Sequence, residues 1–306
     1  MAAQLVSGYL AIAIDLGGTQ IRAGIVDETG RIHRREAVRT QSDSNAEIVI
    51  AQIVSLIAQV TAGVSPTMIA GIGMSSPGPI DTSTGETLGL PSIKGFEDYA
   101  LRTVLSERLG RPVALENDGI SAVIGEWQLG AGKDFANIVY VTVSTGVGGG
   151  VIVDNRVMRG RRGMAGHVGH MSIVPHGERC GCGNLGCWEA YASATNFTKR
   201  AKAAGAGDDA AKVFEAARAG NRLALKLVAE QAEYLAQGFV SLMHLFSPDV
   251  LIMGGGMSQQ FDLLQDPIME HVSTYAMKPF QGCRIVPAAL GTDSGLIGAS
   301  RLVFMG

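Results

Sequence analysis

Short apolar runs, glycine-rich turns and amphipathic stretches alternate along the whole chain. Residues 9–14 form a continuous apolar run, which is typical of a buried strand. A turn with two glycines follows over residues 15–19, and residues 21–26 predict a return strand. This pattern predicts a hairpin of two buried strands near the start of the chain.

The same arrangement returns about half a chain later. Residues 138–143 predict a strand, residues 144–149 a turn rich in glycine and hydroxyl groups, and residues 150–153 a return strand. In both halves, amphipathic stretches and further apolar runs follow the hairpin. An alternation of this kind predicts an α/β sheet in each half of the chain.

Amphipathic stretches of helical period are expected to cover these sheets. In the first half they occupy residues 46–60 and 99–109, and the expected strands between and after them are residues 68–74 and 112–115. In the second half, residues 221–246 predict one long helix, whose expected buried face contains Leu223, Leu227, Tyr234, Leu242 and Leu245. The strands expected after it are residues 250–253 and 285–286.

The repeated arrangement predicts two related lobes with a cleft between them, and the duplicated turns facing each other across it. We assign residues 1–117 to an N-terminal lobe and residues 118–294 to a C-terminal lobe. A last helix over about residues 295–306 is expected to pack back on the first lobe.

Composition and charge restrict the classes of function. Of 306 residues, 46% are hydrophobic and 17% are charged, so a disordered chain is not expected. The net charge of −3, without a block of like charges, gives no electrostatic basis for binding nucleic acid or an acidic membrane surface. The N-terminus has no basic leader and only a short apolar run, and no stretch is long enough to span a membrane. A cytoplasmic protein is therefore expected.

Glycine turns can also serve as anion sites, because backbone N–H groups without a neighbouring Cβ can approach a phosphate closely. Tight hairpins are the alternative, and for an isolated pair of glycines they are the commoner use. Two matched turns with hydroxyl residues, and a third glycine run after residue 253, favour a nucleotide. The candidate nucleotide-binding residues are Gly17, Gly18, Thr19, Ser144, Thr145, Gly146, Gly254, Gly255 and Gly256. Asp15, at a strand end beside the first turn, could hold Mg²⁺ directly or through water.

Three of the four cysteines, Cys180, Cys182 and Cys187, lie in a single segment. Such clustering fits metal binding in a reducing compartment better than a disulfide framework. Soft thiolates with one imidazole suit Zn²⁺ in a closed, structural, four-coordinate site. By spacing alone His167, His170 and His176 compete for the fourth position, and buried cysteines without a metal are the alternative.

The order of these motifs resembles the ROK family of sugar kinases. Asp-Leu-Gly-Gly-Thr at residues 15–19, Glu-Asn-Asp at 116–118, Gly-His-Val-Gly-His at 166–170 and Cys-Gly-Cys-Gly-Asn-Leu-Gly-Cys-Trp-Glu at 180–189 follow one another. The last two segments are the most specific, and the motifs span nearly the whole chain. The resemblance implies the actin-like ATPase (ribonuclease H-like) fold and phosphorylation of a hexose or hexosamine, usually on the C6 hydroxyl, by Mg-ATP. It also implies homodimers or homotetramers.

The resemblance implies a role for individual residues. Asp118 would be the general base that takes the proton of the C6 hydroxyl, and Asn117 would bind ring hydroxyls. His170 and Glu189 would contact the sugar, as would the backbone of Gly78, whereas Ser92 lies in a loop too variable for a role to be transferred. The zinc-binding loop would span residues 167–189, with His170, Cys180, Cys182 and Cys187 as ligands. A helix cap is the alternative for the Asn-Asp pair.

One position departs from the family pattern. Most of these kinases have Glu-x-Gly-His, where the glutamate contacts the sugar near C1 and C2, but this chain has His167-Val168-Gly169-His170. A neutral imidazole can donate a hydrogen bond to an N-acetyl carbonyl, which a carboxylate would repel. The segment is similar to that of bacterial N-acetylmannosamine kinases. His167 is therefore expected to favour N-acetylmannosamine, with glucose as the runner-up.

Two classes without chemistry are the rivals. A sugar-sensing regulator of the same family would carry a DNA-binding module before the first strand, for which this sequence leaves no room, and would not need Asp118. A zinc-stabilised interaction protein is the other rival. The sugar, the phosphoryl donor (ATP or polyphosphate) and the oligomeric state stay open at this level.

Overall fold

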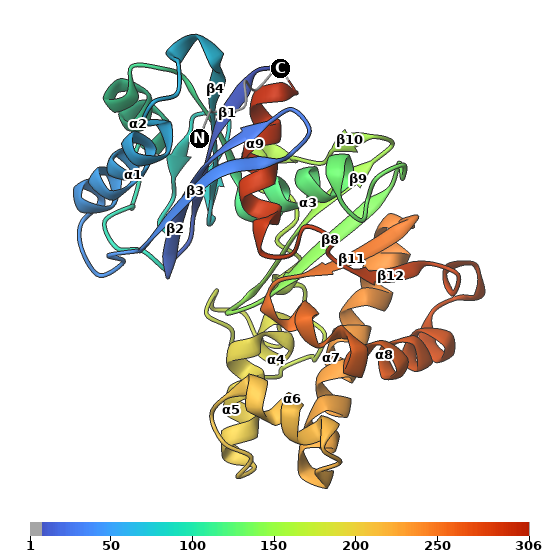
Figure 1. The fold of residues 1–306 in the computed structure, drawn as a ribbon. Helices are drawn as coiled ribbons and strands as arrows, with labels where there is room; N and C mark the ends of the chain where they lie inside the picture. Colours follow the sequence, from blue (N-terminus) through green and yellow to red (C-terminus); the bar gives the residue numbers. More distant parts are fainter. Residues whose placement is uncertain (1–7, 306) are drawn as a thin grey trace. The chain divides into compact units, whose positions relative to one another are not determined.

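Two five-stranded sheets of identical topology organise the chain (Figure 1). The structure is a computed structural model and describes residues 8–305. Residues 1–7 of the segment considered above for a leader peptide, and the last residue of the expected C-terminal helix, lie outside these residues. Of the described residues, unit 1 contains 8–129, 159–165 and 293–305, and unit 2 contains 130–158 and 166–292.

In unit 1 the strand order is β3-β2-β1-β4-β7. The first three strands form an antiparallel meander, and the last two lie parallel to β1. Their bounds are β1 (Leu10–Leu16), β2 (Gln20–Asp27), β3 (Ile32–Arg39), β4 (Ile69–Ser76) and β7 (Val113–Asn117). A separate two-stranded ribbon pairs β5 (Ile80–Asp81) with β6 (Glu86–Thr87).

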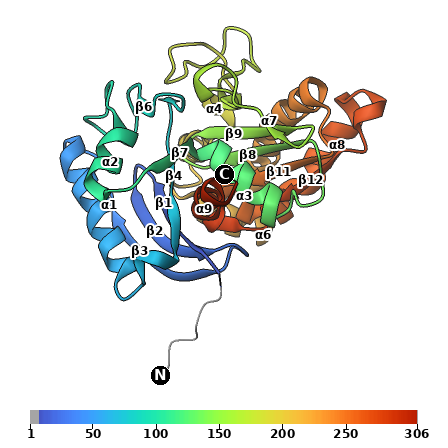
Figure 2. The same cartoon turned by 90° about the horizontal axis from the view of Figure 1, so that it is seen from above.

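Alternating side chains of β1 face two different layers of helices. Ile12 and Ile14 belong to the core beneath α1 (Ala46–Thr61) and α2 (Leu101–Leu109), whereas Ala13 packs with the C-terminal helix α9 (Ser294–Phe304). Figure 2 shows α1 and α2 on one side of the sheet, and α9 with α3 (Asp118–Leu129) on the other. Small residues line the α9 side, since a Cβ on Gly73 would lie only 1.9 Å from the Ala299 carbonyl oxygen.

Unit 2 repeats the same sheet in the order β10-β9-β8-β11-β12. Its strands are β8 (Ile138–Val143), β9 (Val147–Val153), β10 (Arg156–Val157), β11 (Val250–Gly254) and β12 (Arg284–Pro287). Its helices are α4 (Glu189–Ala192), α5 (Ala194–Ala203), α6 (Ala210–Arg218), α7 (Arg222–Phe246) and α8 (Phe261–Tyr275). One apolar core joins the sheet to these helices, with Trp188 and Phe239 at its centre.

Short 3₁₀ helices connect the larger elements. They are η1 (Pro66–Met68), η2 (Arg161–Gly163), η3 (Val168–His170), η4 (Gly256–Gln260), η5 (Lys278–Phe280) and η6 (Gly291–Asp293).

The matching topologies confirm the duplication predicted from the two hairpins, and the α/β fold class with it. Two local predictions are wrong. The turn after β8 is shorter than expected, because Gly148 and Gly149 already belong to β9. Leu223 and Leu245 of α7 are 38% and 69% exposed rather than buried, whereas Ala224 and Met243 in the same two turns are buried.

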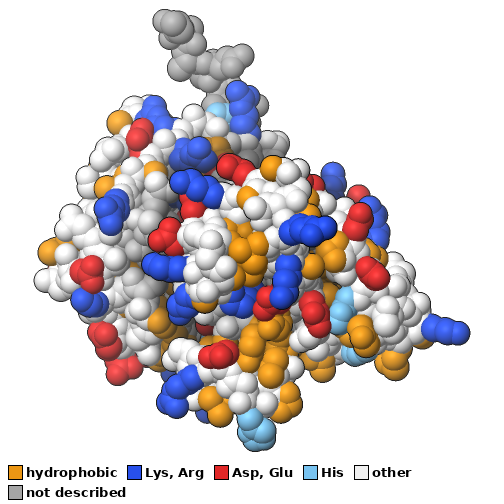
Figure 3. Space-filling view, turned by 90° about the horizontal axis from the view of Figure 1, so that it is seen from below, with side chains coloured by type: hydrophobic (Ala, Val, Ile, Leu, Met, Phe, Trp, Pro, Cys, Tyr) orange, Lys and Arg blue, Asp and Glu red, His pale blue; other side chains and the backbone are white. Residues whose placement is uncertain are grey.

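The structure groups α3 with unit 1, twelve residues beyond the lobe boundary placed at residue 117 from the sequence. The physical reason is close packing of α3 against α9, where a Cβ on Gly298 would lie 1.8 Å from the Ser121 carbonyl oxygen. On the face shown in Figure 3, basic and acidic side chains are interspersed with small groups of apolar ones. Within residues 8–305, no helix combines the length and the apolar character that crossing a bilayer requires.

Candidate active site and metal centre

The predicted site residues of unit 1 follow three neighbouring parallel strands. Asp15 lies in β1 next to its end, Gly78 follows β4, and Asn117 ends β7 with Asp118 directly after it. The register pairs Asp15 with Ser75 and Ser76 with Asn117. These residues therefore meet at the carboxyl edge of one sheet, where open α/β sheets bind their ligands.

Asp15 is 8% exposed and accepts a hydrogen bond of 2.5 Å from the Arg22 guanidinium. Burial raises the pKa of Asp15, which the charge of Arg22 only partly offsets, and the carboxylate of Asp293 raises it further. Sequence reasoning missed Arg22, although the hairpin register places it directly opposite Asp15. The oxygen donors of Asp15 fit Mg²⁺ best through water, because one of them already accepts from Arg22.

Backbone hydrogen bonds stabilise the turn after β1. The Gly17 N–H donates to the Gln20 carbonyl at 3.0 Å, and the Thr40 N–H donates to the Thr19 carbonyl at 3.0 Å. A Cβ on Gly18 would lie 2.6 Å from the Cβ of Ser92, so only glycine fits there. Ser92, which the sequence left without a role, covers this turn.

Asn117 and Asp118 share one backbone donor at the start of α3. The Gly119 N–H lies 3.0 Å from the Asn117 Oδ1 and 2.8 Å from the Asp118 Oδ1. The Asn117 side chain therefore caps α3, as the alternative reading of this pair expected. Asn117 is buried, whereas the Asp118 side chain is exposed and fixed in orientation.

In unit 2, His170, Cys180, Cys182 and Cys187 form one cluster, in which all ligand atoms lie within 4.8 Å of one another. The Cys180 Sγ lies 3.7 Å from the His170 Nδ1, and the Cys182 and Cys187 Sγ atoms are 3.6 Å apart. Tetrahedral zinc with bonds of about 2.0–2.3 Å holds its ligand atoms roughly 3.5–3.8 Å apart. The cluster therefore fits a closed Zn²⁺ site.

The other two histidines of the segment are outside the cluster. The His167 ring stacks on the His170 ring with centroids 6.3 Å apart, and His176 is exposed. Burial and the neighbouring thiols of Cys182 and Cys180 raise the pKa of Cys187 to about 12. A bound cation would be needed to hold that group as a thiolate at neutral pH.

Glu189 joins the cysteine cluster to the glycine turn after β8. Its Oε2 accepts from the Val147 N–H at 2.9 Å, and the Cys180 Sγ lies 3.7 Å from its Oε1. A Cβ on Gly146 would lie 2.5 Å from the same Oε2. The carboxylate is therefore positioned by both features at once.

The two remaining glycine turns also meet at one sheet edge. The Ser144–Gly146 turn follows β8, and Gly254–Gly256 continues the parallel neighbour β11. A Cβ on Gly255, whose φ is +78°, would lie 2.4 Å from the Val143 carbonyl oxygen, whereas nothing lies within 4 Å of one on Gly256. Ser144 and Thr145 are exposed, so this edge presents hydroxyl groups beside backbone that only glycine can adopt.

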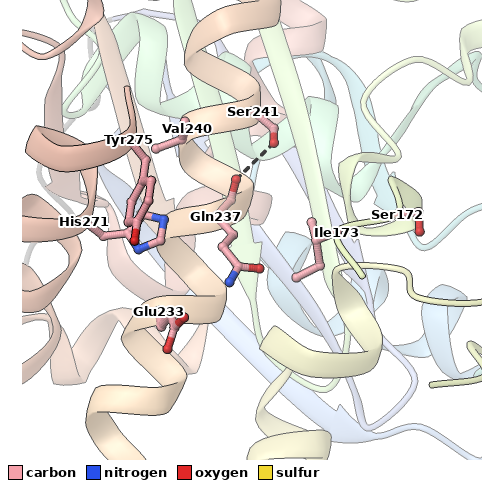
Figure 4. A pocket seen from close by; sticks show the side chains of 8 residues that line it. All are labelled: Ser172, Ile173, Glu233, Gln237, Val240, Ser241, His271 and Tyr275. Carbon is pink, nitrogen blue, oxygen red and sulfur yellow. Dashed lines mark hydrogen bonds between the residues drawn. The ribbon is translucent and has the colours of Figure 1, made fainter. Parts of the chain in front are cut away.

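A hollow of about 510 Å³ in unit 2 has none of these predicted residues in its lining. Figure 4 shows its lining, which comes from α7, α8 and the residues after His170: Ser172, Ile173, Glu233, Gln237, Val240, Ser241, His271 and Tyr275. Burial lowers the pKa of His271, whose ring contacts Tyr275 at 4.4 Å between centroids. The lining contains neither a glycine turn nor a cysteine, so the hollow has none of the chemistry predicted for the site.

The protein-family model of the ROK family matches residues 11–305 of this chain. A glucokinase of Thermotoga maritima is 35% identical over 308 residues, covering 95% of this chain and 96% of that protein. An N-acetylmannosamine kinase of Haemophilus influenzae is 30% identical over 292 residues, covering 94% of this chain and 93% of that protein.

Solved structures give the same result. A ROK family glucokinase from Streptomyces griseus, in complex with glucose and AMPPNP, superposes with a TM-score of 0.85 at 34% identity. The match covers 97% of this chain and 100% of that one. With the duplicated sheets, it confirms the actin-like fold expected from the motifs.

Proposed function

The chain belongs to the ROK family and is a sugar kinase, and from this premise we propose that it transfers the γ-phosphoryl group of ATP to the C6 hydroxyl of a hexose or N-acetylhexosamine. The observation that carries the proposal is the Asp118 carboxylate. It is exposed, fixed by the Gly119 N–H, and lies on the same sheet edge as the glycine turn after β1.

Asp118 acts as the general base. Its carboxylate accepts the proton of the C6 hydroxyl while the hydroxyl oxygen attacks the γ-phosphorus, and ADP leaves with the electrons of the broken P–O bond. Phosphoryl transfer asks the protein mainly for positioning, neutralised charge and such a base. Asn117 binds ring hydroxyls with its amide and caps α3 with the same group.

Glycine turns are the proposed phosphate-binding elements of each unit. Gly17, Gly18 and Thr19 in unit 1, and Ser144, Thr145 and Gly146 in unit 2, offer backbone N–H groups and hydroxyls to phosphate oxygens. Gly254, Gly255 and Gly256 extend the second set along the same sheet edge. Asp15 would hold Mg²⁺ directly or through water, and the ion would supply charge neutralisation at the phosphates.

The cysteine cluster binds one structural Zn²⁺ through His170, Cys180, Cys182 and Cys187. The main support is that the four ligand atoms lie within 4.8 Å of one another, with two of the pairs at 3.7 and 3.6 Å. No ligand position is left for a reacting water, so the ion holds side chains in place. His170 and Glu189 contact the sugar from this rigid segment, and Gly78 does so through its backbone.

The sugar specificity has two candidates, each with its own support. His167, where related kinases have glutamate, favours an N-acetyl group, and an N-acetylmannosamine kinase is among the relatives at 30% identity. The glucokinase relative at 35% identity favours glucose. We place N-acetylmannosamine first, because His167 is a residue of the proposed site, whereas identity averages over the chain.

A coupled assay of ADP release tests the proposal across glucose, mannose, fructose, allose, N-acetylglucosamine and N-acetylmannosamine. The expected result is sugar-dependent ADP release that requires Mg²⁺. Running each sugar with polyphosphate in place of ATP, and with direct detection of the sugar phosphate, checks the donor. No turnover with any of these sugars and ATP would refute the function.

A further inference from the structure

Three arginine side chains line one hollow in unit 1, which has a volume of about 420 Å³. Arg102 comes from α2, and Arg159 and Arg162 come from the segment around η2. Ala114 and Leu115 of β7 and Leu302 of α9 form the apolar wall of its lining. The volume lies in the range of small-molecule pockets.

Buried carboxylates hold two of these arginines from beneath. The Arg159 Nε donates to the Glu116 Oε2 at 2.9 Å, and the Arg162 Nε donates to the Asp81 Oδ2 at 2.6 Å. The carboxylate side chains are 3% and 6% exposed, whereas the arginine side chains are 46% and 44% exposed. Among residues 8–305, neither arginine makes a hydrogen bond through its Nη groups, and both side chains are partly exposed, so these donors are accessible to a ligand.

The backbone that presents the arginines is locked in place. Arg162 has a φ of +63°, in the left-handed region, and its carbonyl accepts from the Thr82 N–H at 2.9 Å. A Cβ on Gly163 would lie 1.8 Å from the Thr82 Oγ1, so the segment packs directly on the turn after β5. Arg102 donates to the carbonyl groups of the same turn, at Thr82 and Ser83, at 3.2 and 2.7 Å.

Three guanidinium groups therefore face two carboxylates, which leaves an excess of positive charge at a preorganised set of donors. We propose that this hollow binds a small phosphate monoester, with its phosphate on the Nη groups of Arg159 and Arg162 and its carbon skeleton against the apolar wall. Guanidinium groups suit phosphate because two parallel N–H donors match two phosphate oxygens.

The site adjoins the strand that presents the proposed catalytic base. Glu116 directly precedes Asn117 and Asp118 in β7, and its Oε1 accepts from the Asn117 N–H at 3.0 Å. The Glu116 carboxylate therefore contacts both Arg159 and the backbone of Asn117. A ligand that draws Arg159 toward solvent would change the interactions of this carboxylate. None of the residues assigned to the sugar or the nucleotide lines the hollow.

Glutamine is the informative substitution for both arginines. In arginine Nε is bonded to Cδ, and in glutamine Nε2 is bonded to Cδ as well. Arg159→Gln and Arg162→Gln can therefore keep the hydrogen bond to each buried carboxylate while they delete the Nη donors. Arg161→Gln is the matched control, because Arg161 is exposed, lies in the same segment and does not line the hollow.

Isothermal titration of the full chain, without nucleotide or Mg²⁺, compares inorganic phosphate and glucose 6-phosphate as probes. The parent should bind both, and glucose 6-phosphate more tightly because of the apolar wall. The double variant Arg159→Gln/Arg162→Gln should weaken binding by at least about tenfold, the scale of lost charge-assisted hydrogen bonds. Arg161→Gln should change it by less than about twofold.

Several results would overturn the proposal: no binding to the parent at millimolar concentration, equal affinity in the parent and the double variant, or an equal loss in the control. Binding of inorganic phosphate but not of glucose 6-phosphate would also do so. If the double variant fails to fold by circular dichroism, Arg162→Gln alone replaces it, with a loss of several-fold expected. The titration requires no turnover, so its result is separate from that of the kinase assay.

Discussion

The Asp118 carboxylate is the single group on which turnover is expected to depend most. Asp118→Asn keeps the size of the side chain and an oxygen that can accept from the Gly119 N–H, but it cannot take a proton. Sugar binding should persist while kcat falls by a factor of roughly 10² or more, the scale of a general-base contribution. Titration of the sugar and steady-state kinetics measure the two effects. Turnover within a few-fold of the parent would reduce Asp118 to a binding residue.

His167 is expected to influence the choice of sugar. His167→Glu should shift the ratio of kcat/KM for N-acetylmannosamine and glucose toward glucose, because a carboxylate repels the N-acetyl carbonyl. One hydrogen bond sets the scale, on the order of tenfold. His176→Glu is the matched control, since His176 is exposed in the same segment and lies outside the cysteine cluster. A parent that prefers glucose outright, or an equal shift in the control, would contradict this role.

At this scale the sequence predicts residue types well and partners poorly. Spacing alone left three histidines in competition for the metal, and the structure brings only His170 to the thiols. The pairing of Arg22 with Asp15 depends on hairpin register, and the contact of Ser92 with Gly18 depends on a loop fold. Neither the register nor the loop has a sequence pattern strong enough to fix it.

At the scale of elements, the close packing of α9 on α3 depends on a glycine in α9, which has no side chain. A Cβ on Gly298 would lie 1.8 Å from the Ser121 carbonyl oxygen, and backbone cannot move aside cheaply. Gly298→Ala should therefore destabilise the protein by about 1–3 kcal/mol, as overpacking does. Helix propensity alone predicts that replacing glycine by alanine in a helix increases stability. A decrease in the free energy of unfolding would therefore indicate the steric clash. Urea unfolding measures the change.

Gly282→Ala is the control for that substitution. Gly282 is exposed, no heavy atom lies within 4 Å of its added Cβ, and its φ is outside the left-handed region. The free energy of unfolding of this variant should stay within about 0.5 kcal/mol of that of the parent. If Gly298→Ala were as stable as Gly282→Ala, α9 would not need its close approach to α3.

Elements with a buried, periodic pattern could be predicted, and those without one could not. β8 and α1 match the expected residues closely, because their apolar side chains repeat at the strand and helix periods. β3 is absent from the sequence prediction because most of its side chains are exposed and half of them are charged. It is an edge strand that pairs with β2 through backbone hydrogen bonds. Such bonds do not require apolar side chains, so the hydrophobic pattern does not reveal the strand.

For the whole molecule, the main consequence of duplication is that each unit has a large apolar core of its own. Every residue of the larger core belongs to unit 2, and the core beneath α1 belongs wholly to unit 1. The motifs predicted the repeated fold because each hairpin and its glycine turn are local. They could not predict that α3 would group with unit 1, since that depends on α9 returning from the far end of the chain.

Separate cores make the effect of zinc removal specific. The parent should contain one zinc per chain, and Cys187→Ser should lose it, whereas Cys283→Ser should keep it because Cys283 is outside the cluster. Elemental analysis measures the content. Zinc in the Cys187→Ser variant, or none in the parent, would contradict the site.

Amide hydrogen exchange then locates the damage that chelation causes. Removing the ion should raise exchange across residues 167–189 and at the Val147 N–H, because Glu189 links the cluster to the turn after β8. Strands β1, β4 and β7 should keep their protection, since their side chains belong to the other core. Sugar binding should be lost at the same time, because His170 and Glu189 are no longer held. Full activity after complete chelation, or loss of protection throughout unit 1, would show that the ion does not act through this segment alone.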